Sequence, residues 1–134
     1  MPTRETSPAI TVDTAAECIP RGTLAATIID LDCGIVVCLE GEAGVIGLER
    51  MQIAFARVAA RRARLAVLDL ARLTFMSSLA IGQLVALRRD LDRWNGRLKL
   101  AACPPTIHEV LEKTGLSKFF EFHPSVEEAI AANT

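Results

Sequence analysis

Two adjacent serines, Ser77 and Ser78, are the side chains of this 134-residue sequence whose type and setting best suit covalent chemistry. They follow a buried apolar run and precede a helical pattern, which predicts that they lie at the N-terminus of a helix. Free backbone N–H groups and the helix dipole favour a negative charge there, such as a phosphoryl group. A capping serine by itself stabilises a helix by about 1 kcal/mol relative to alanine, and this simpler role accounts for one of the two. The neighbouring Leu79, Ala80 and Ile81 are expected to face solvent in part and to suit a contact surface.

Other kinds of catalytic or metal site have less support from the sequence. The serines lack the G-x-S-x-G turn of hydrolases, while His108 falls in a predicted helix and His123 precedes a proline. Cys103 and His108 do not form the paired short spacings of a zinc site, and no Gly-Lys-Ser/Thr motif marks a phosphate-binding loop. The sequence therefore predicts a protein that is not an enzyme and holds no metal or cofactor. A hydrolytic arrangement of Ser78, His108 and Asp69 is the remaining alternative.

The composition narrows the class of protein. The chain is 51% hydrophobic and 23% charged with a formal net charge of -1, which is typical of a globular domain and argues against direct nucleic-acid binding. Its longest charge-free stretch, residues 73–87, is shorter than the roughly 20 apolar residues that span a bilayer. The first residues contain no apolar signal region and the four cysteines form no C-x-x-C pair. We therefore expect a cytoplasmic protein with no membrane insertion.

The hydrophobic pattern predicts one α/β domain. Residues 1–21 contain three prolines without periodicity and are expected to form a flexible N-terminal tail, followed by a single domain over residues 22–134. Strands are predicted over residues 24–30 and 35–39, as an antiparallel hairpin, and over residues 65–68, 97–100 and 119–122. Helices are predicted from about Val45, between Ile81 and Trp94, from Pro104 to Gly115 and from Ser125. This alternation predicts a mixed, mostly parallel sheet of four to five strands with about four helices.

Several short motifs together resemble the STAS domain of bacterial anti-sigma factor antagonists. The resemblance extends over about residues 24–132 and rests on Leu39-Glu40-Gly41-Glu42, Leu68-Asp69-Leu70, Leu73-Thr74-Phe75-Met76, Leu87-Arg88-Arg89, Thr114-Gly115-Leu116 and Val126-Glu127-Glu128-Ala129. A common family form, Phe-Met-Asp-Ser-Ser-Gly-Leu-Gly, aligns without gaps with residues 75–82. Ser78 then takes the place of the phosphorylated serine of the family, and Ser77 is the less favoured acceptor.

The sequence departs from the family form at four positions. Ser77 stands in place of Asp, Leu79 in place of a second Ser or Thr, and Ala80 in place of Gly. Upstream, Gly44 stands where the family usually has Asp.

The resemblance implies a small α/β domain that works by partner switching. In such proteins an anti-sigma factor with serine kinase activity phosphorylates the domain, whereas the unmodified domain binds that factor and frees a sigma factor. The residues that the resemblance assigns to partner contact are Met76, Ser77, Ser78, Leu79, Ala80, Ile81, Glu42 and Gly44. The alternative is a phosphorylation-independent STAS scaffold subunit of a signalling complex or of a lipid or anion transporter. A homodimer is left open.

Overall fold

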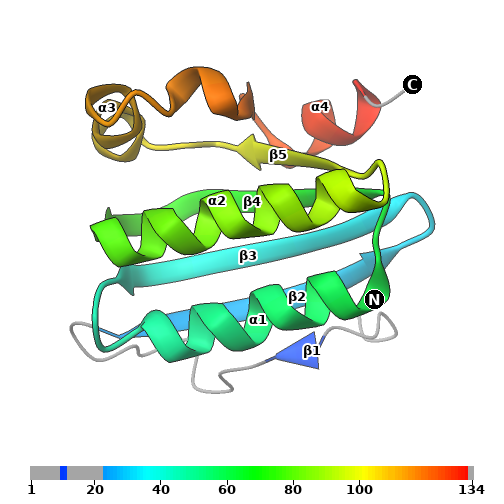
Figure 1. Cartoon of the computed structure of the whole chain (residues 1–134), viewed down its shortest axis with the longest axis horizontal. Coiled ribbons are helices and arrows are strands. Elements are labelled where there is room, and N and C mark those ends of the chain that lie inside the picture. Colours follow the sequence, from blue (N-terminus) through cyan, green and yellow to red (C-terminus); the bar gives the residue numbers. More distant parts are fainter. Residues whose placement is uncertain (1–9, 12–22, 133–134) are drawn as a thin grey trace.

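The computed structural model describes residues 10–11 and 23–132, which form one layered α/β domain (Figure 1). A single sheet has the strand order β1-β2-β3-β4-β5-β6. Its strands are β1 (Ile10–Thr11), β2 (Leu24–Leu31), β3 (Gly34–Ala43), β4 (Leu65–Met76), β5 (Arg97–Ala101) and β6 (Glu121–His123). The α-helices are α1 (Leu48–Arg61), α2 (Ser78–Arg93), α3 (Pro105–Lys113) and α4 (Val126–Ala131).

The pairing of the strands confirms the predicted fold class. β2 and β3 form the expected antiparallel hairpin, and β3 with β4, β4 with β5 and β5 with β6 are parallel. The two-residue β1 pairs antiparallel with β2 and adds a strand to the four or five predicted. It lies within residues 1–21, where a flexible tail was expected, and the other residues of that segment lie outside the described part of the chain.

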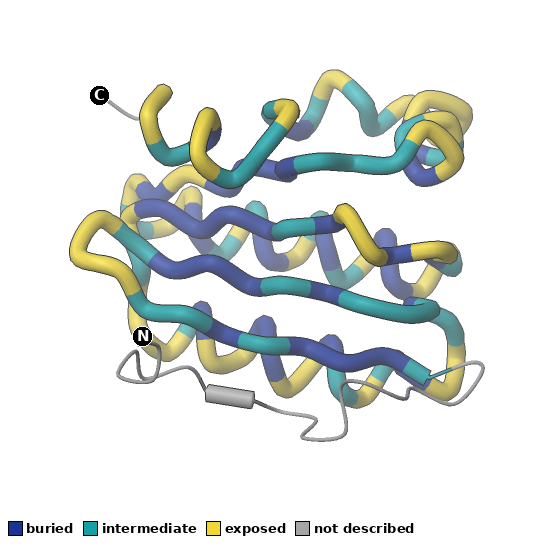
Figure 2. Tube along the Cα trace, turned by 180° about the vertical axis from the view of Figure 1, so that it is seen from behind, coloured by how far each residue is buried: buried dark blue, intermediate teal, exposed yellow. Residues whose placement is uncertain are grey.

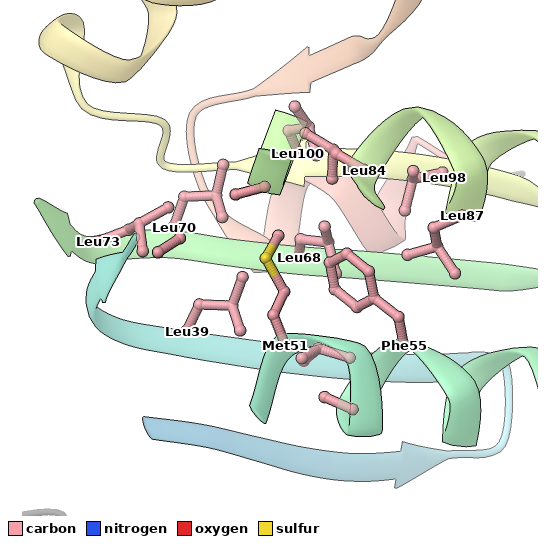
Figure 3. Packing of buried hydrophobic residues seen from close by; sticks show 14 of the residues in the cluster. Leu39, Met51, Phe55, Leu68, Leu70, Leu73, Leu84, Leu87, Leu98 and Leu100 are labelled. Carbon is pink, nitrogen blue, oxygen red and sulfur yellow. The ribbon is translucent and has the colours of Figure 1, made fainter. Parts of the chain in front are cut away.

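The core lies mainly between the sheet and helices α1, α2 and α3. Apolar side chains at helical spacing on α1 and α2 pack on alternate residues of β2, β3 and β4, as Figure 3 shows for Met51, Phe55, Leu68, Leu84 and Leu87. The opposite face of the sheet carries a smaller cluster against α4, which consists of Val36, Leu65, Val67, Ala101 and Ala129. Seen from that side, the middle of the sheet is buried or half-buried while its outer turns are exposed (Figure 2). Within the described residues, no helix has the length and apolar character needed to cross a bilayer.

Three predicted strands have bounds that differ by more than one residue in the structure. The second strand of the hairpin was expected over residues 35–39, but β3 spans Gly34–Ala43. The third predicted strand was expected over residues 65–68, but β4 continues to Met76, with register shifts against β3 that interrupt the regular alternation of side chains. The last strand was predicted over residues 119–122 and occupies Glu121–His123 instead. A short 3-10 helix, Ser117–Phe119, precedes it because the chain turns tightly after α3 before it reaches the edge of the sheet.

A buried lysine joins the C-terminal elements to the sheet. Lys99 on β5 is fully buried, and its Nζ donates a hydrogen bond to the carbonyl oxygen of Ala129, 2.8 Å away, in α4. The same Nζ lies 3.5 Å from Oε2 of Glu121 on β6. Glu121 also accepts a hydrogen bond from Arg97 at 2.8 Å and bonds His123 at 2.7 Å. This network ties β6 and α4 to β5.

The network predicts a loss of stability in acid. Partial burial acts to raise the pKa of Glu121, but hydrogen bonds from His123 and Arg97 and the charges of Lys99 and Arg97 outweigh it, so the pKa of Glu121 lies below its usual value. The stability that the carboxylate contributes is therefore present above the pKa of the unfolded chain, about 4.3, and is lost as pH falls through the lower folded pKa. We expect Glu121→Gln to lower the urea midpoint of unfolding at pH 7 and to have a smaller effect near pH 3.

The matched control is Glu127→Gln, on the exposed side of α4, which should leave the urea midpoint close to that of the wild type at both pH values. If the Glu121→Gln difference stayed the same from pH 7 to pH 3, the stabilising role assigned to the carboxylate would be wrong.

Candidate functional site

The two serines lie where the ends of β3 and β4 meet the start of α2, at the left edge of Figure 1. The last register pair of these parallel strands is Ala43 with Met76. The backbone N–H of Ser77 then donates to the carbonyl oxygen of Ala43 over 2.9 Å. The start of α2 is thereby fixed to the end of β3 and to the loop that follows it. We refer to this place as the β4–α2 corner, defined by residues 42–46 and 75–79.

Ser77 and Ser78 have different structural roles at this corner. Ser77 is the N-cap of α2, with an extended backbone, and its half-buried Oγ accepts a hydrogen bond from the N–H of Ala80 over 3.2 Å. Ser78 is the first helical residue and is exposed. None of the hydrogen bonds found among the described residues involves the Ser78 hydroxyl. Ser77 therefore caps the helix, whereas the hydroxyl of Ser78 is accessible from solvent.

The capping role of Ser77 leads to a stability prediction. Ser77→Ala removes the acceptor for the N–H of Ala80, so we expect it to lower the free energy of unfolding by about 1 kcal/mol, measured by urea denaturation. Ser77→Asp keeps a capping oxygen and should cost much less. Ser78→Ala is the comparison at an exposed neighbouring site, where a loss of about 1 kcal/mol would mean that both hydroxyls are structural.

Large apolar side chains are exposed around the two serines. Val45 and Ile46 in the loop before α1 are 76% and 70% exposed, and Phe75 and Leu79 are 49% and 56% exposed. The backbone of Gly44 lies against the Phe75 ring, since a Cβ at Gly44 would be 3.5 Å from that ring. Only Leu79 of these four was predicted as a contact residue. The signal that would have found Val45 and Ile46 is the presence of bulky apolar residues in a loop flanked by glycines.

The structure corrects part of the predicted contact surface. Leu79 faces solvent as expected, but the same expectation is wrong for Ala80 and Ile81, which are 0% and 6% exposed. Both continue the inward face of α2 with Leu84, so their side chains pack in the core.

The other predicted contact residues differ in burial. Met76 is buried, at 3% exposure, because it ends the core side of β4. Glu42 and Gly44 lie at the corner and are half-buried. Contact with a partner by these predicted residues remains a prediction.

The arrangement considered for hydrolysis is absent from the hydrogen-bond pattern of the described residues. Asp69 Oδ1 accepts from the N–H of Ala71 at 3.1 Å, and its Oδ2 lies 3.7 Å from Sγ of Cys38. His108 packs its ring on Phe122, with a centroid distance of 4.7 Å. No hydrogen bond described here connects Ser78 with either of these side chains.

The half-buried thiols of Cys38 and Cys103 are poorly suited to nucleophilic chemistry. Burial raises the pKa of the Cys38 thiol to about 11, with the charge of Asp69 adding to the effect, and burial alone raises the pKa of Cys103 to about 11. Since the thiolate is the nucleophile, both thiols are inert near neutral pH. Within residues 10–11 and 23–132, no three His, Cys, Asp or Glu side chains are grouped so as to hold a metal ion.

Known proteins share both this sequence pattern and this fold. A Bordetella bronchiseptica protein named "putative anti-sigma factor antagonist BtrV" is 29% identical over 102 residues, which cover 76% of this chain and 88% of that protein. The crystal structure of an anti-sigma factor antagonist from Mycobacterium paratuberculosis has a TM-score of 0.75 at 25% identity and covers 82% of this chain and 93% of that one. The phosphorylated form of SpoIIAA, a Bacillus cell fate determinant, has a TM-score of 0.58 at 26% identity, covering 75% and 90% of the two chains.

The similarity to these individual proteins agrees with a match to a domain family. The family model of the STAS domain matches residues 22–129, which is most of the chain and includes the whole β4–α2 corner. The protein belongs to the STAS domain family, and within that family it is like the anti-sigma factor antagonists.

Proposed function

We propose that this protein is an anti-sigma factor antagonist that binds an anti-sigma factor with serine kinase activity and is released from it by phosphorylation of Ser78. The observation that carries the proposal is the exposure of Ser78 at the first turn of α2, where its hydroxyl makes no hydrogen bond to the described residues and lies beside exposed apolar side chains. Supporting it, the related Bacillus protein SpoIIAA has been seen in a phosphorylated form.

The local structure suits a phosphoryl group on Ser78 in the free protein. Phosphorylation adds about -1.5 to -2 charges and three acceptor oxygens, which free N–H groups and the helix dipole at the start of α2 accommodate. In the complex the same charge is unfavourable, because a docked partner removes the water that solvates it. About 2.7 kcal/mol of differential binding is enough to change an affinity a hundredfold. The switch therefore needs no large conformational change.

The departures from the family form are compatible with this role. Ser77 stands where the family has Asp, yet both residue types can cap a helix through a side-chain oxygen, and Ser77 does so here. Ala80 stands where the family has Gly, and its methyl group is buried in the core. With both changes present, Ser78 is exposed.

The test combines phosphosite mapping with a binding measurement. The full-length chain is incubated with ATP and each purified anti-sigma factor kinase of the source organism, and the products are mapped by mass spectrometry. We expect modification of Ser78, none of Ser77, and binding of the modified chain at least a hundredfold weaker than that of the unmodified chain. Ser78→Ala should bind the kinase and resist modification.

Two outcomes would contradict the proposal. If neither serine is modified by any of these kinases, regulation by this route is wrong. If Ser78→Ala and Ser78→Asp bind the partner equally well, the protein is a phosphorylation-independent scaffold subunit, as in the alternative that the sequence left open.

A further inference from the structure

The exposed apolar side chains of the described chain are concentrated at one corner. Of the six large hydrophobic side chains that are exposed, four belong to the β4–α2 corner, and the other two are Leu31 and Ile53. The four come from three separate segments: Val45 and Ile46 from the loop before α1, Phe75 from β4 and Leu79 from the first turn of α2. We call these four side chains the apolar rim.

Backbone contacts keep the rim close to Ser78. Phe75 pairs in register with Glu42, and the next pair joins Ala43 to Met76. The Ser77 N–H bonds the carbonyl oxygen of Ala43, and the backbone of Gly44 lies against the Phe75 ring. The loop that carries Val45 and Ile46 is thus anchored next to the serines. Leu79 follows Ser78 directly in α2.

Apart from the contact of the Phe75 ring with Gly44, the rim side chains are not needed to stabilise the corner. The caps and core of α2 are complete without these side chains, since Ser77 provides the cap and Ala80, Ile81 and Leu84 provide the buried face. Clusters of exposed apolar groups on a soluble domain mark contact surfaces. The four side chains have no polar group that could replace water around a charge. A charge at Ser78 would therefore be desolvated without compensation from the rim once a partner covered it.

We infer that the apolar rim is the surface on which apolar side chains of the anti-sigma factor pack. A phosphoryl group on Ser78 then opposes binding because its charge is desolvated in this contact. A positive charge at position 78 would be desolvated in the same way and would also oppose binding. The inference rests on the proposed function, since it explains how modification of the same serine acts. Two other mechanisms give the same end result: repulsion between the phosphoryl group and acidic groups of the partner, and obstruction by the bulk of the group.

Substitutions at Ser78 separate the three mechanisms. Binding to the purified anti-sigma factor kinase is measured by calorimetry for Ser78→Glu, Ser78→Lys and the neutral Ser78→Gln and Ser78→Met, in the full-length chain. We expect Glu and Lys each to weaken binding at least tenfold, and the two neutral variants to stay within threefold of the wild type. Binding of the Lys variant at wild-type strength would overturn the inference in favour of repulsion. Equal losses for all four variants would overturn it in favour of bulk.

Substitutions in the rim test the contact surface itself. Leu79→Ser should weaken binding of the unmodified chain at least fivefold, because it removes apolar area from the contact, and should also reduce the penalty of Ser78→Glu. Leu31→Ser is the matched control: the same change at an exposed leucine at the end of β2, at the other end of the sheet, with an expected effect below twofold. Melting temperatures show whether each variant is folded.

The outcomes distinguish this inference from the function on which it rests. If the unmodified chain binds no anti-sigma factor kinase, the proposed function is wrong and the inference falls with it. If the chain binds and phosphorylation releases it, but Leu79→Ser binds as tightly as Leu31→Ser, the proposed function stands and the apolar rim is not the contact surface.

Discussion

Gly41→Ala is expected to destabilise the domain by about 3 kcal/mol and to disorder the corner that carries Ser78. Gly41 has a φ of +110°, a conformation that L side chains rarely adopt, and an added Cβ would lie 2.4 Å from the carbonyl oxygen of Thr23 on the neighbouring chain segment. Backbone strain of this kind costs about 1–3 kcal/mol, and the clash with a backbone atom adds to it. Urea denaturation measures the loss of stability directly.

The effect should extend to the β4–α2 corner because the backbone at Gly41 and Glu42 is hydrogen-bonded to both neighbouring chain segments. Its carbonyl oxygen accepts a hydrogen bond from Oγ1 of Thr74 over 3.0 Å, and the next residue, Glu42, donates its N–H to Thr23 over 2.9 Å. Moving the backbone to relieve the clash breaks one of these contacts. We therefore expect faster amide hydrogen exchange at residues 42–44 in the Gly41→Ala variant than in the wild type.

Gly82→Ala is the matched control for this prediction. Gly82 lies in α2, is exposed, and an added Cβ there would meet nothing within 4 Å. Since alanine favours a helix over glycine, this variant should gain about 0.5–1 kcal/mol of stability. A Gly41→Ala variant as stable as the Gly82→Ala variant would show that the strand adapts to the side chain, contrary to our expectation.

The helices and the hairpin could be predicted from the sequence because burial there follows a simple period. Of the apolar residues of α1 that recur at helical spacing, Met51, Phe55 and Val58 are buried and Leu48 and Ala59 are half-buried. The full length of β4 could not be predicted in this way. Beyond Asp69 its buried residues are Leu70, Leu73 and Met76, which are spaced by three rather than two. Register shifts against β3 produce this spacing, and they depend on the partner strand rather than on β4 itself.

The location of the β4–α2 corner in the chain was predicted from the sequence, but the roles of its individual residues were not. The apolar-then-helical pattern placed the two serines at the start of a helix, and the structure shows them there. Which serine caps and which is exposed depends on the position of the first helical turn, which the pattern leaves uncertain by a residue or two. The helical period did hold the signal that Ile81 faces inward, because Ile81 continues the buried stripe of Leu84 and Leu87. The contribution of Val45 and Ile46 depends on β3 and β4 ending side by side, a long-range contact.

Lys99→Ala is expected to destabilise the domain by about 3 kcal/mol, an effect as large as that of the strained glycine but from a different cause. Lys99 is the buried charged residue of the described core, and its Nζ bonds the carbonyl oxygen of Ala129 and faces Glu121. Truncation leaves a cavity, removes the donor that Lys99 provides to the carbonyl oxygen of Ala129 and leaves the carboxylate of Glu121 without one of its cations. A buried carbonyl oxygen that loses its donor costs about 1–3 kcal/mol and the cavity adds to this, whereas Glu121, whose side chain is 35% exposed, keeps Arg97 and His123 and loses little.

The variant Lys99→Met separates charge from packing. Methionine fills most of the space of the lysine stem but, like alanine, cannot donate to the carbonyl oxygen of Ala129, so we expect Lys99→Met to avoid the cavity and to lose only about 1–2 kcal/mol. Because α4 and β6 depend on this contact, hydrogen exchange in residues 121–131 should be faster in Lys99→Ala while that in α1 and α2 is less affected. Equal losses for the two variants would mean that the hydrogen bond to Ala129, and not the filled space, holds the C-terminal elements to the sheet.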